Sequence, residues 1–207
     1  MATFKSKKRV WITGANGFIG KNIIEKFNKN KYEILATNRQ DLDLNNYIKV
    51  KFFLKKYKPN VIINTAGLVG GIIRNKREKY ELLVENLKSS VNLIDQVYKN
   101  YNNEIYLNLS SSCIYPNNLN KRIKENMLNL KDIESSSEYY ALSKIISLKI
   151  CKELHGRNFK FYSIIPSNLF GKYDDFSIEN SHVIGSLINK FCNNKNKINL
   201  LGSGIAK

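Results

Sequence analysis

A glycine-rich turn near the N-terminus limits the possible folds of this chain more than any other feature. The apolar run 9–13 leads into it, and the helical pattern 21–30 follows. A strand, a glycine turn and a helix in this order form the phosphate-binding start of a βαβ unit, because glycines let the backbone approach a pyrophosphate at the helix N-terminus. We therefore expect the turn to bind a dinucleotide, although glycines that serve only a tight turn would look similar. The residues of the turn are Gly14, Ala15, Asn16, Gly17, Phe18, Ile19 and Gly20.

Further apolar segments along the chain predict an α/β fold. Strands are expected at residues 32–37, 61–64, 105–109 and 161–165, and helices at 46–58, 78–100 and 138–154, with another beginning near 181–184. Strands that are apolar throughout are typical of a parallel sheet buried on both faces. The sequence therefore predicts a Rossmann-type, doubly wound parallel sheet with helices on both faces.

The end of the second predicted strand bears on the choice of cofactor. An acidic side chain there would bind the ribose 2′-hydroxyl of NAD, but this chain has Thr37-Asn38-Arg39. Amide and guanidinium donors suit a 2′-phosphate, so Arg39 favours NADP(H), although a solvated loop cation is the simpler alternative. In the next run, Asp41-Leu42-Asp43-Leu44, we expect the leucines to point inward and the carboxylates to cap the following helix.

Tyr140 and Lys144 lie four residues apart in a predicted helix, which places them one turn apart on the same face. A free phenol has a pKa of about 10, and a neighbouring ammonium lowers this pKa by stabilising the phenolate. Tyr139 has no basic residue four places on, so the register selects Tyr140. The pattern alone is weak, because exposed helix faces produce it by chance.

The run Ser110-Ser111-Ser112-Cys113 strengthens the pattern because it follows the fourth predicted strand, and ligands in open α/β sheets bind at strand C-termini. Ser111 would hydrogen-bond a substrate carbonyl beside Tyr140. Serines after a strand are commonly part of a turn, and a cysteine is commonly a small buried apolar residue. Of the two histidines, His182 would suit proton transfer beside an anionic ligand or a thiol, whereas His155 is assigned to a helix cap or the surface.

Composition excludes several other classes of protein. The net charge of +17 would attract nucleic acid, but Lys is spread along the whole chain with many Asn residues and no nucleic-acid-binding motif focuses it, so we expect no such partner. Three cysteines without C-x-x-C spacing argue against a disulfide framework and against a metal site. No apolar run approaches the length of a membrane span, and the N-terminus leads into a strand instead of a signal segment. A cytoplasmic protein without membrane contact is expected.

The motifs G-A-N-G-F-I-G, N-T-A-G-L-V-G-G-I, S-S-C-I-Y-P, Y-x-x-x-K and P-S-N-L-F-G-K-Y-D-D-F-x-x-x-N-S-H-V-I occur in this order over essentially the whole chain. Together they resemble the GDP-L-fucose synthase family of extended short-chain dehydrogenases/reductases. That family converts GDP-4-keto-6-deoxy-D-mannose to GDP-L-fucose with NADPH, epimerising at C3 and C5 before it reduces C4.

The resemblance implies roles for individual residues. Tyr140 would be the general acid at the 4-keto oxygen, Lys144 would lower its pKa and hold the nicotinamide ribose, and Ser111 would orient the carbonyl. Cys113 and His182 would be the base and the acid of the two epimerisations. Besides the glycine turn, the implied cofactor contacts are Arg39, Leu44, Ala66, Leu109, Ser110, Ser111, Ser112, Lys144, Pro166, Ser167, Asn168, Leu169 and His182. The implied substrate contacts are Lys190 and Leu201.

The chain also departs from the family pattern. Members continue with a smaller C-terminal substrate domain, so we expect residues 1–171 to be the NADP-binding domain and 172–207 the incomplete start of the substrate-binding region. An arginine expected just past Gly-Ser-Gly is absent, and Asn16 stands where some members carry a basic residue. The enzyme is expected to act on a GDP-sugar as a fragment or as one half completed by a separate polypeptide, and to form a homodimer through helices 78–100 and 138–154, by analogy.

Two alternatives stay open. One is a truncated, noncatalytic NADP(H)-binding module. The other is a different nucleotide-sugar epimerase or dehydratase of the same superfamily. A dehydratase would place Asp-Glu where Ser112-Cys113 stand, and a simple 4-epimerase would need neither Cys113 nor His182.

Overall fold

The computed structural model describes residues 7–100, 104–116, 122–128, 132–157, 159–177 and 180–193. Its centre is a parallel sheet of β1 (Lys8–Thr13), β2 (Tyr32–Thr37), β3 (Val61–Asn64), β4 (Ile105–Leu109) and β5 (Phe161–Ile164). The strand order is β2-β1-β3-β4-β5, so the sheet grows in opposite directions on the two sides of β1. Ligands of open α/β sheets bind outside the strand C-termini at such a point.

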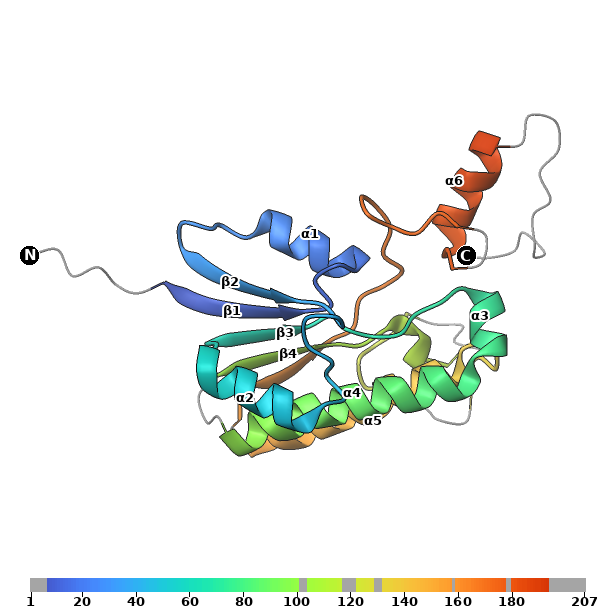
Figure 1. The fold of residues 1–207 in the computed structure, drawn as a ribbon. Coiled ribbons are helices and arrows are strands. Elements are labelled where there is room, and N and C mark those ends of the chain that lie inside the picture. Colours follow the sequence, from blue (N-terminus) through green and yellow to red (C-terminus); the bar gives the residue numbers. More distant parts are fainter. Residues whose placement is uncertain are drawn as a thin grey trace, which may run out of the picture.

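Helices cover both faces of the sheet (Figure 1). α2 (Tyr47–Tyr57), α4 (Lys79–Asn100) and α5 (Glu138–Gly156) lie along one face, and α1 (Phe18–Lys26) lies on the other. The short α3 (Ile72–Arg77) and α6 (Val183–Asn193) lie beyond the strand C-termini. The Rossmann-type fold predicted from the sequence is confirmed. α3 was not predicted because six residues are too few to show a helical period.

The core lies between the sheet and the α2, α4 and α5 layer. Trp11 is fully buried at its centre, and its indole nitrogen donates a hydrogen bond of 2.9 Å to the Thr37 hydroxyl, which satisfies the one polar atom of the ring. Leu42 and Leu44 point inward, as expected. The other buried residues of this cluster are Val50, Leu54, Ile62, Leu93, Ile94, Val97, Tyr106, Cys151, Leu154 and Phe161.

The start of α2 differs from the prediction. Asn46 is the N-cap, and its side chain accepts a hydrogen bond of 3.0 Å from the backbone nitrogen of Lys49. The carboxylates of Asp41 and Asp43 accept from the backbone nitrogens of Asn38 and Asn45 within the preceding turns. The predicted capping by these carboxylates is therefore wrong, because a short acidic side chain bonds most readily to backbone two or three residues away.

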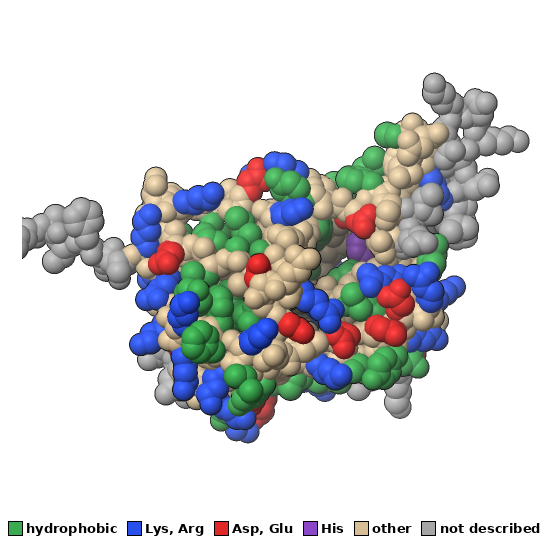
Figure 2. All heavy atoms as spheres, viewed as in Figure 1, with side chains coloured by type: hydrophobic (Ala, Val, Ile, Leu, Met, Phe, Trp, Pro, Cys, Tyr) green, Lys and Arg blue, Asp and Glu red, His purple; other side chains and the backbone are tan. Residues whose placement is uncertain are grey.

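Charge is spread over the surface. Figure 2 shows Lys and Arg side chains across the visible face, with Asp and Glu among them. Within the described part of the chain, no helix has both the length and the apolar character that crossing a bilayer requires. The same residues contain no group of three or more His, Cys, Asp or Glu side chains arranged to hold a metal ion.

Candidate active site

The glycine turn packs tightly against its surroundings. Gly14 has φ +64°, and a Cβ atom there would lie 2.8 Å from the backbone of Ala66 in the loop after β3. A Cβ atom at Gly20 would lie 2.3 Å from the carbonyl oxygen of Gly14. Gly14 and Gly20 therefore bring β1, the loop after β3 and the start of α1 into direct contact.

The N-terminus of α1 is suited to an anion. Its N-cap is Gly17, whose backbone nitrogen donates to the Gly14 carbonyl at 3.0 Å and which has no side chain to cap the helix. The first turn contains no acidic residue. Amide groups and the positive end of the helix dipole thus face outward at the turn, an arrangement that fits a pyrophosphate.

A cavity of about 440 Å³ lies beside the glycine turn, bordered by the end of β2 and the loop after β3. Six of the predicted cofactor residues line it: Gly14, Asn16, Gly17, Arg39, Leu44 and Ala66. The cavity therefore gathers the residues assigned to the phosphates and to the adenosine end of the cofactor.

Other predicted cofactor residues lie elsewhere. Ala15 is buried behind the turn, and its backbone nitrogen donates to the Thr37 carbonyl at 3.0 Å. Phe18, Ile19 and Leu169 line a separate cavity of about 780 Å³ along α1. The structure does not bring these side chains into the cavity beside the turn.

A cluster of polar side chains forms at the C-terminal end of β4. Lys144 on α5 is buried, and its ammonium donates to the Leu109 carbonyl at 3.0 Å and lies 5.5 Å from the centre of the Tyr140 ring. The Ser111 side chain is hydrogen-bonded to Tyr140 and also accepts from the backbone nitrogen of Cys113 at 3.4 Å. Cys113 lies in the single 3₁₀ turn Ser112–Ile114 that follows β4. The fold thus assembles the predicted catalytic group apart from His182.

The ionisation of this cluster differs from the prediction. Burial raises the pKa of Tyr140, a negative charge on Cys113 would raise it further, and the hydrogen bond from Ser111 opposes both effects. Burial also lowers the pKa of Lys144 to about 8. The expected lowering of the Tyr140 pKa by Lys144 is therefore wrong for this structure, because loss of water around the phenol dominates.

The pKa of the Cys113 thiol also depends on burial, and neighbouring groups act in the opposite direction. Burial raises the pKa of its thiol, while the hydrogen bond from Ser111 and the charge of Lys144 lower it. The thiol is partly accessible, unlike the fully buried Cys151. Cys113 is therefore the more reactive candidate of these two.

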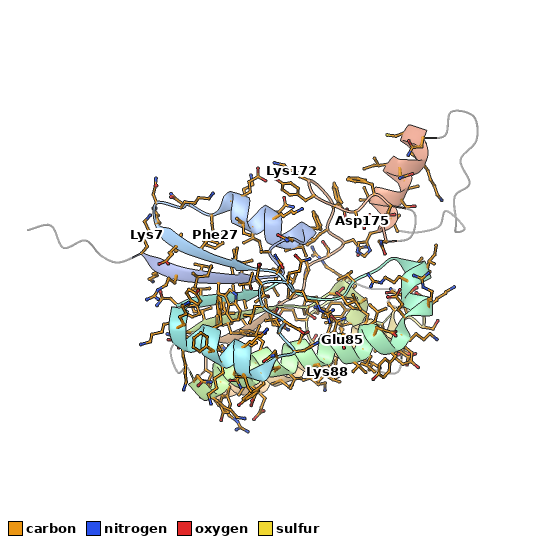
Figure 3. All side chains as sticks on the ribbon, viewed as in Figure 1. Lys7, Phe27, Glu85, Lys88, Lys172 and Asp175 are labelled. Atoms are coloured by element: carbon orange, nitrogen blue, oxygen red, sulfur yellow. The ribbon has the colours of Figure 1, made fainter. Side chains whose placement is uncertain are left out.

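His182 lies directly before α6, beside the loop after β5. It is exposed, and it lies close enough to Asp175 for its charge to contribute to the lowered pKa of that carboxyl, which arises first from hydrogen bonds with Ser177. Asp175 belongs to the loop between β5 and α6, above the strand ends in Figure 3. None of the hydrogen bonds or ion pairs found among the described residues joins His182 to Tyr140 or Cys113.

The remaining predicted residues lie around the strand ends. Ser110 is buried, and its backbone nitrogen donates to the Ile164 carbonyl at 2.8 Å. Ser112 donates to the Asn168 side chain at 3.4 Å, which links the loops after β4 and β5, where Pro166 and Ser167 also lie. Lys190 lies in the last turn of α6. Leu201 falls outside the described residues.

Sequence profiles and known proteins identify the family. The NAD dependent epimerase/dehydratase family matches residues 10–207. This chain belongs to that family. It is 37% identical over 205 residues to a GDP-L-colitose synthase of Yersinia pseudotuberculosis, covering 96% of this chain and 66% of the relative. It is 36% identical over 186 residues to a GDP-L-fucose synthase of Sinorhizobium fredii, covering 88% of this chain and 58% of the relative.

Solved structures agree with this family membership. A Campylobacter jejuni GDP-D-glycero-L-gluco-heptose synthase, crystallised in the presence of NADPH, superposes with a TM-score of 0.82 at 26% identity, over 90% of this chain and 55% of that one. A GDP-mannoheptose C4 reductase from the same organism, with NADP bound, gives a TM-score of 0.80 at 26% identity, over 90% of this chain and 56% of that one. The chain therefore spans less than two thirds of each of these relatives.

Two residues near the candidate site were not assigned to it from the sequence, and Asn86 was expected to be structural. Asn86 on α4 accepts from the backbone nitrogen of Leu68 at 2.7 Å and donates to its carbonyl at 2.9 Å, which fixes the loop after β3. A Cβ atom at Gly67 in this loop would lie 3.4 Å from Asn86 and 3.5 Å from the Lys144 ammonium. Glu85 lines the cavity beside the glycine turn and binds Arg39. Neither residue belongs to one of the sequence motifs, because both lie within the long helix α4.

Proposed function

We propose that this chain is the cofactor-binding and catalytic part of an NADPH-dependent enzyme that converts GDP-4-keto-6-deoxy-D-mannose to GDP-L-fucose. The reaction comprises epimerisation at C3 and C5 and reduction at C4. The observation that carries the proposal is the convergence of Tyr140, Ser111, Cys113 and Lys144 at the end of β4. The identities of 36% to a GDP-L-fucose synthase and 37% to a GDP-L-colitose synthase support a GDP-sugar as the substrate class.

The residues of the cavity fit a dinucleotide. The uncapped start of α1 would hold the pyrophosphate, Arg39 the 2′-phosphate, and Leu44 and Ala66 the adenosine. Lys144 would hold the ribose next to the nicotinamide. When bound, NADPH supplies the hydride that reduces C4.

Tyr140 supplies the proton for this reduction. Its raised pKa keeps the phenol protonated at neutral pH, so it can donate to the 4-keto oxygen as negative charge develops there. Ser111, hydrogen-bonded to Tyr140, would donate to the same oxygen. The Lys144 ammonium then stabilises the phenolate that remains. Burial therefore keeps Tyr140 protonated before the reaction, and Lys144 stabilises the Tyr140 phenolate after the proton has been transferred.

Cys113 would act in the epimerisations. The protons at C3 and C5 are acidic because each carbon is adjacent to the C4 ketone, whose enolate oxygen Tyr140 and Ser111 can stabilise. A thiolate at Cys113 would remove these protons, with Lys144 and Ser111 opposing the effect of burial on the thiol pKa. His182, directly before α6, would return a proton from the opposite side of the sugar ring.

A second candidate is a 4-keto reductase that does not epimerise. The exposed position of His182, beside Asp175, favours it. Similarity to a protein named as a GDP-mannoheptose C4 reductase is consistent with it. Deuterium incorporation at C3 and C5 of the substrate in D₂O separates the two candidates, because only the epimerase exchanges these protons.

The test measures NADPH oxidation with GDP-4-keto-6-deoxy-D-mannose. The chain is assayed alone and mixed with a polypeptide carrying the part of the Sinorhizobium fredii GDP-L-fucose synthase that it does not span. We expect turnover in the mixture and a loss of about 100-fold or more in Tyr140→Phe. Tyr139→Phe is the matched control, because that ring contacts Lys79 and not the cluster. Turnover that persists in Tyr140→Phe would refute the assignment, and NADPH binding without turnover in any mixture would indicate a noncatalytic module.

A homodimer is also part of the proposal. Val91 on α4 and Ile146 on α5 are exposed apolar side chains on helices that pack against each other. Sedimentation at increasing concentration would test whether the chain dimerises.

A further inference from the structure

Arg39 is already occupied by a side chain of its own chain. Its guanidinium nitrogen lies 2.9 Å from a carboxylate oxygen of Glu85. Arg39 follows the end of β2, whereas Glu85 lies in the second turn of α4, below the strand ends in Figure 3. Both residues line the cavity of about 440 Å³ beside the glycine turn. The residue assigned to the 2′-phosphate is therefore held by an acid in the same cavity.

The geometry fixes Glu85 more firmly than Arg39. The carboxylate oxygen that accepts from Arg39 also accepts from the Asn45 side chain at 2.9 Å. The Glu85 side chain is 30% exposed and the Arg39 side chain 68% exposed. Arg39 is thus the more exposed partner of the pair, and the Asn45 hydrogen bond holds the Glu85 carboxylate independently of it.

An acid in this cavity acts differently on the two nicotinamide cofactors. A 2′-phosphate needs the Arg39 guanidinium, which binds phosphate and carboxylate through the same donors. The Glu85 carboxylate and a 2′-phosphate would therefore compete for Arg39, because both are anions and one guanidinium nitrogen already donates to Glu85. NADH has no 2′-phosphate and leaves the pair intact.

We propose that Glu85 sets the preference between NADPH and NADH by competing with the 2′-phosphate for Arg39. This rests on the proposed function, because the cavity must be the adenosine end of the cofactor site. Glu85 lowers the affinity for NADPH and leaves that for NADH unchanged. Glu85, on α4, thereby reduces the preference for NADP(H) that Arg39 indicates.

Glu85→Gln tests the competition, since glutamine keeps the size and the contact with Asn45 but loses the charge. Exposed ion pairs are worth a factor of roughly 1.4 to 5 in an equilibrium constant, so the variant should bind the 2′-phosphate about two- to fivefold more tightly. The probes are 2′,5′-ADP and 5′-AMP, which differ by the 2′-phosphate, and binding is measured by calorimetry at one ionic strength. NADPH and NADH are compared in parallel by fluorescence.

Two further variants complete the experiment. In an Arg39→Gln background, Glu85→Gln should change the affinity for 2′,5′-ADP by less than about twofold, because no guanidinium is left to release. Glu153→Gln is the control, since it breaks an exposed ion pair of the same 2.9 Å length, with Arg157, on the far end of α5. Glu153→Gln should change neither the affinity for 2′,5′-ADP nor that for 5′-AMP.

The outcomes distinguish the proposed role of Glu85 from the proposed cofactor site. An unchanged ratio of affinities in Glu85→Gln, or weaker binding of 5′-AMP, would overturn the role of Glu85 while the cofactor site stands. A wild-type chain that binds neither 2′,5′-ADP nor NADPH would overturn the cofactor site and, with it, the role of Glu85. A selective gain for 2′,5′-ADP that disappears without Arg39 supports the competition.

Discussion

The buried ammonium of Lys144 makes a measurable contribution to the pH dependence of stability. Its pKa is about 8 in the folded chain, against an ordinary value of 10.5. The folded state therefore releases this proton at a lower pH than the unfolded chain does. Because the unfolded state binds more protons between these values, the free energy of unfolding rises with pH across this interval.

The size of this effect follows from the two pKa values. Below about pH 7 the residue is protonated in both states and contributes no slope. Between pH 7 and 9.5 the wild-type chain should gain roughly 2 kcal/mol of stability relative to Lys144→Met, which has no proton to release. At neutral pH the same burial opposes folding by roughly 3 kcal/mol, part of which the hydrogen bond to Leu109 offsets.

Urea denaturation of both chains at several pH values between 7 and 9.5 measures the difference. The comparison should be made in a Cys113→Ser background, because the charges of the thiol and of Lys144 interact. Groups that the two chains share cancel in the difference. A difference in unfolding free energy that stays constant with pH would show that the ammonium is solvated, and would remove the basis for its role beside Tyr140.

Three other expectations concern the glycine turn, the thiol and the loop after β3. In thermal unfolding, Gly20→Ala should destabilise the chain by about 1–3 kcal/mol, because the new Cβ would lie 2.3 Å from the Gly14 carbonyl oxygen. A Cβ atom at Gly156 would meet nothing within 4 Å, so Gly156→Ala is the control and should be neutral or stabilising by up to about 1 kcal/mol. Cys113→Ser should slow deuterium exchange at C3 and C5 by about 100-fold, and equal exchange in both chains would exclude the thiol as base. Asn86→Leu should lower the affinity for NADPH, since the loop at Leu68 loses both of its hydrogen bonds to α4; unchanged affinity would show that the loop holds its shape without them.

Most of the fold was predictable because its signals are local. The strands at residues 32–37, 61–64 and 105–109 have the predicted bounds, since each is a short apolar run between polar segments. The glycine turn and a helix after it were predictable for the same reason, but the helix is Phe18–Lys26 and not residues 21–30. The N-cap of α2 was not, because Asp41, Asp43 and Asn46 are all good caps, and the path of the chain decides which one faces the helix.

The site was predictable only where its residues belong to a periodic pattern or a strand end. The spacing of Tyr140 and Lys144 places both on one face of α5, and the position of Ser111 after β4 places it at the same edge. Glu85 and Asn86 have no such signal. Their roles arise because α4 passes beneath the loops after β2 and β3, a contact between distant parts of the sequence.

The pKa of Tyr140 shows why spacing alone gives the wrong sign. A helix register predicts that an ammonium lies near a phenol, and proximity by itself lowers the phenol pKa. The register does not predict how much water either group loses. Here burial raises the pKa of Tyr140 and lowers that of Lys144 to about 8, so both groups shift toward their neutral forms. Proton transfer from Tyr140 to a substrate oxygen would leave a phenolate, and the nearby Lys144 ammonium is the group that can stabilise it.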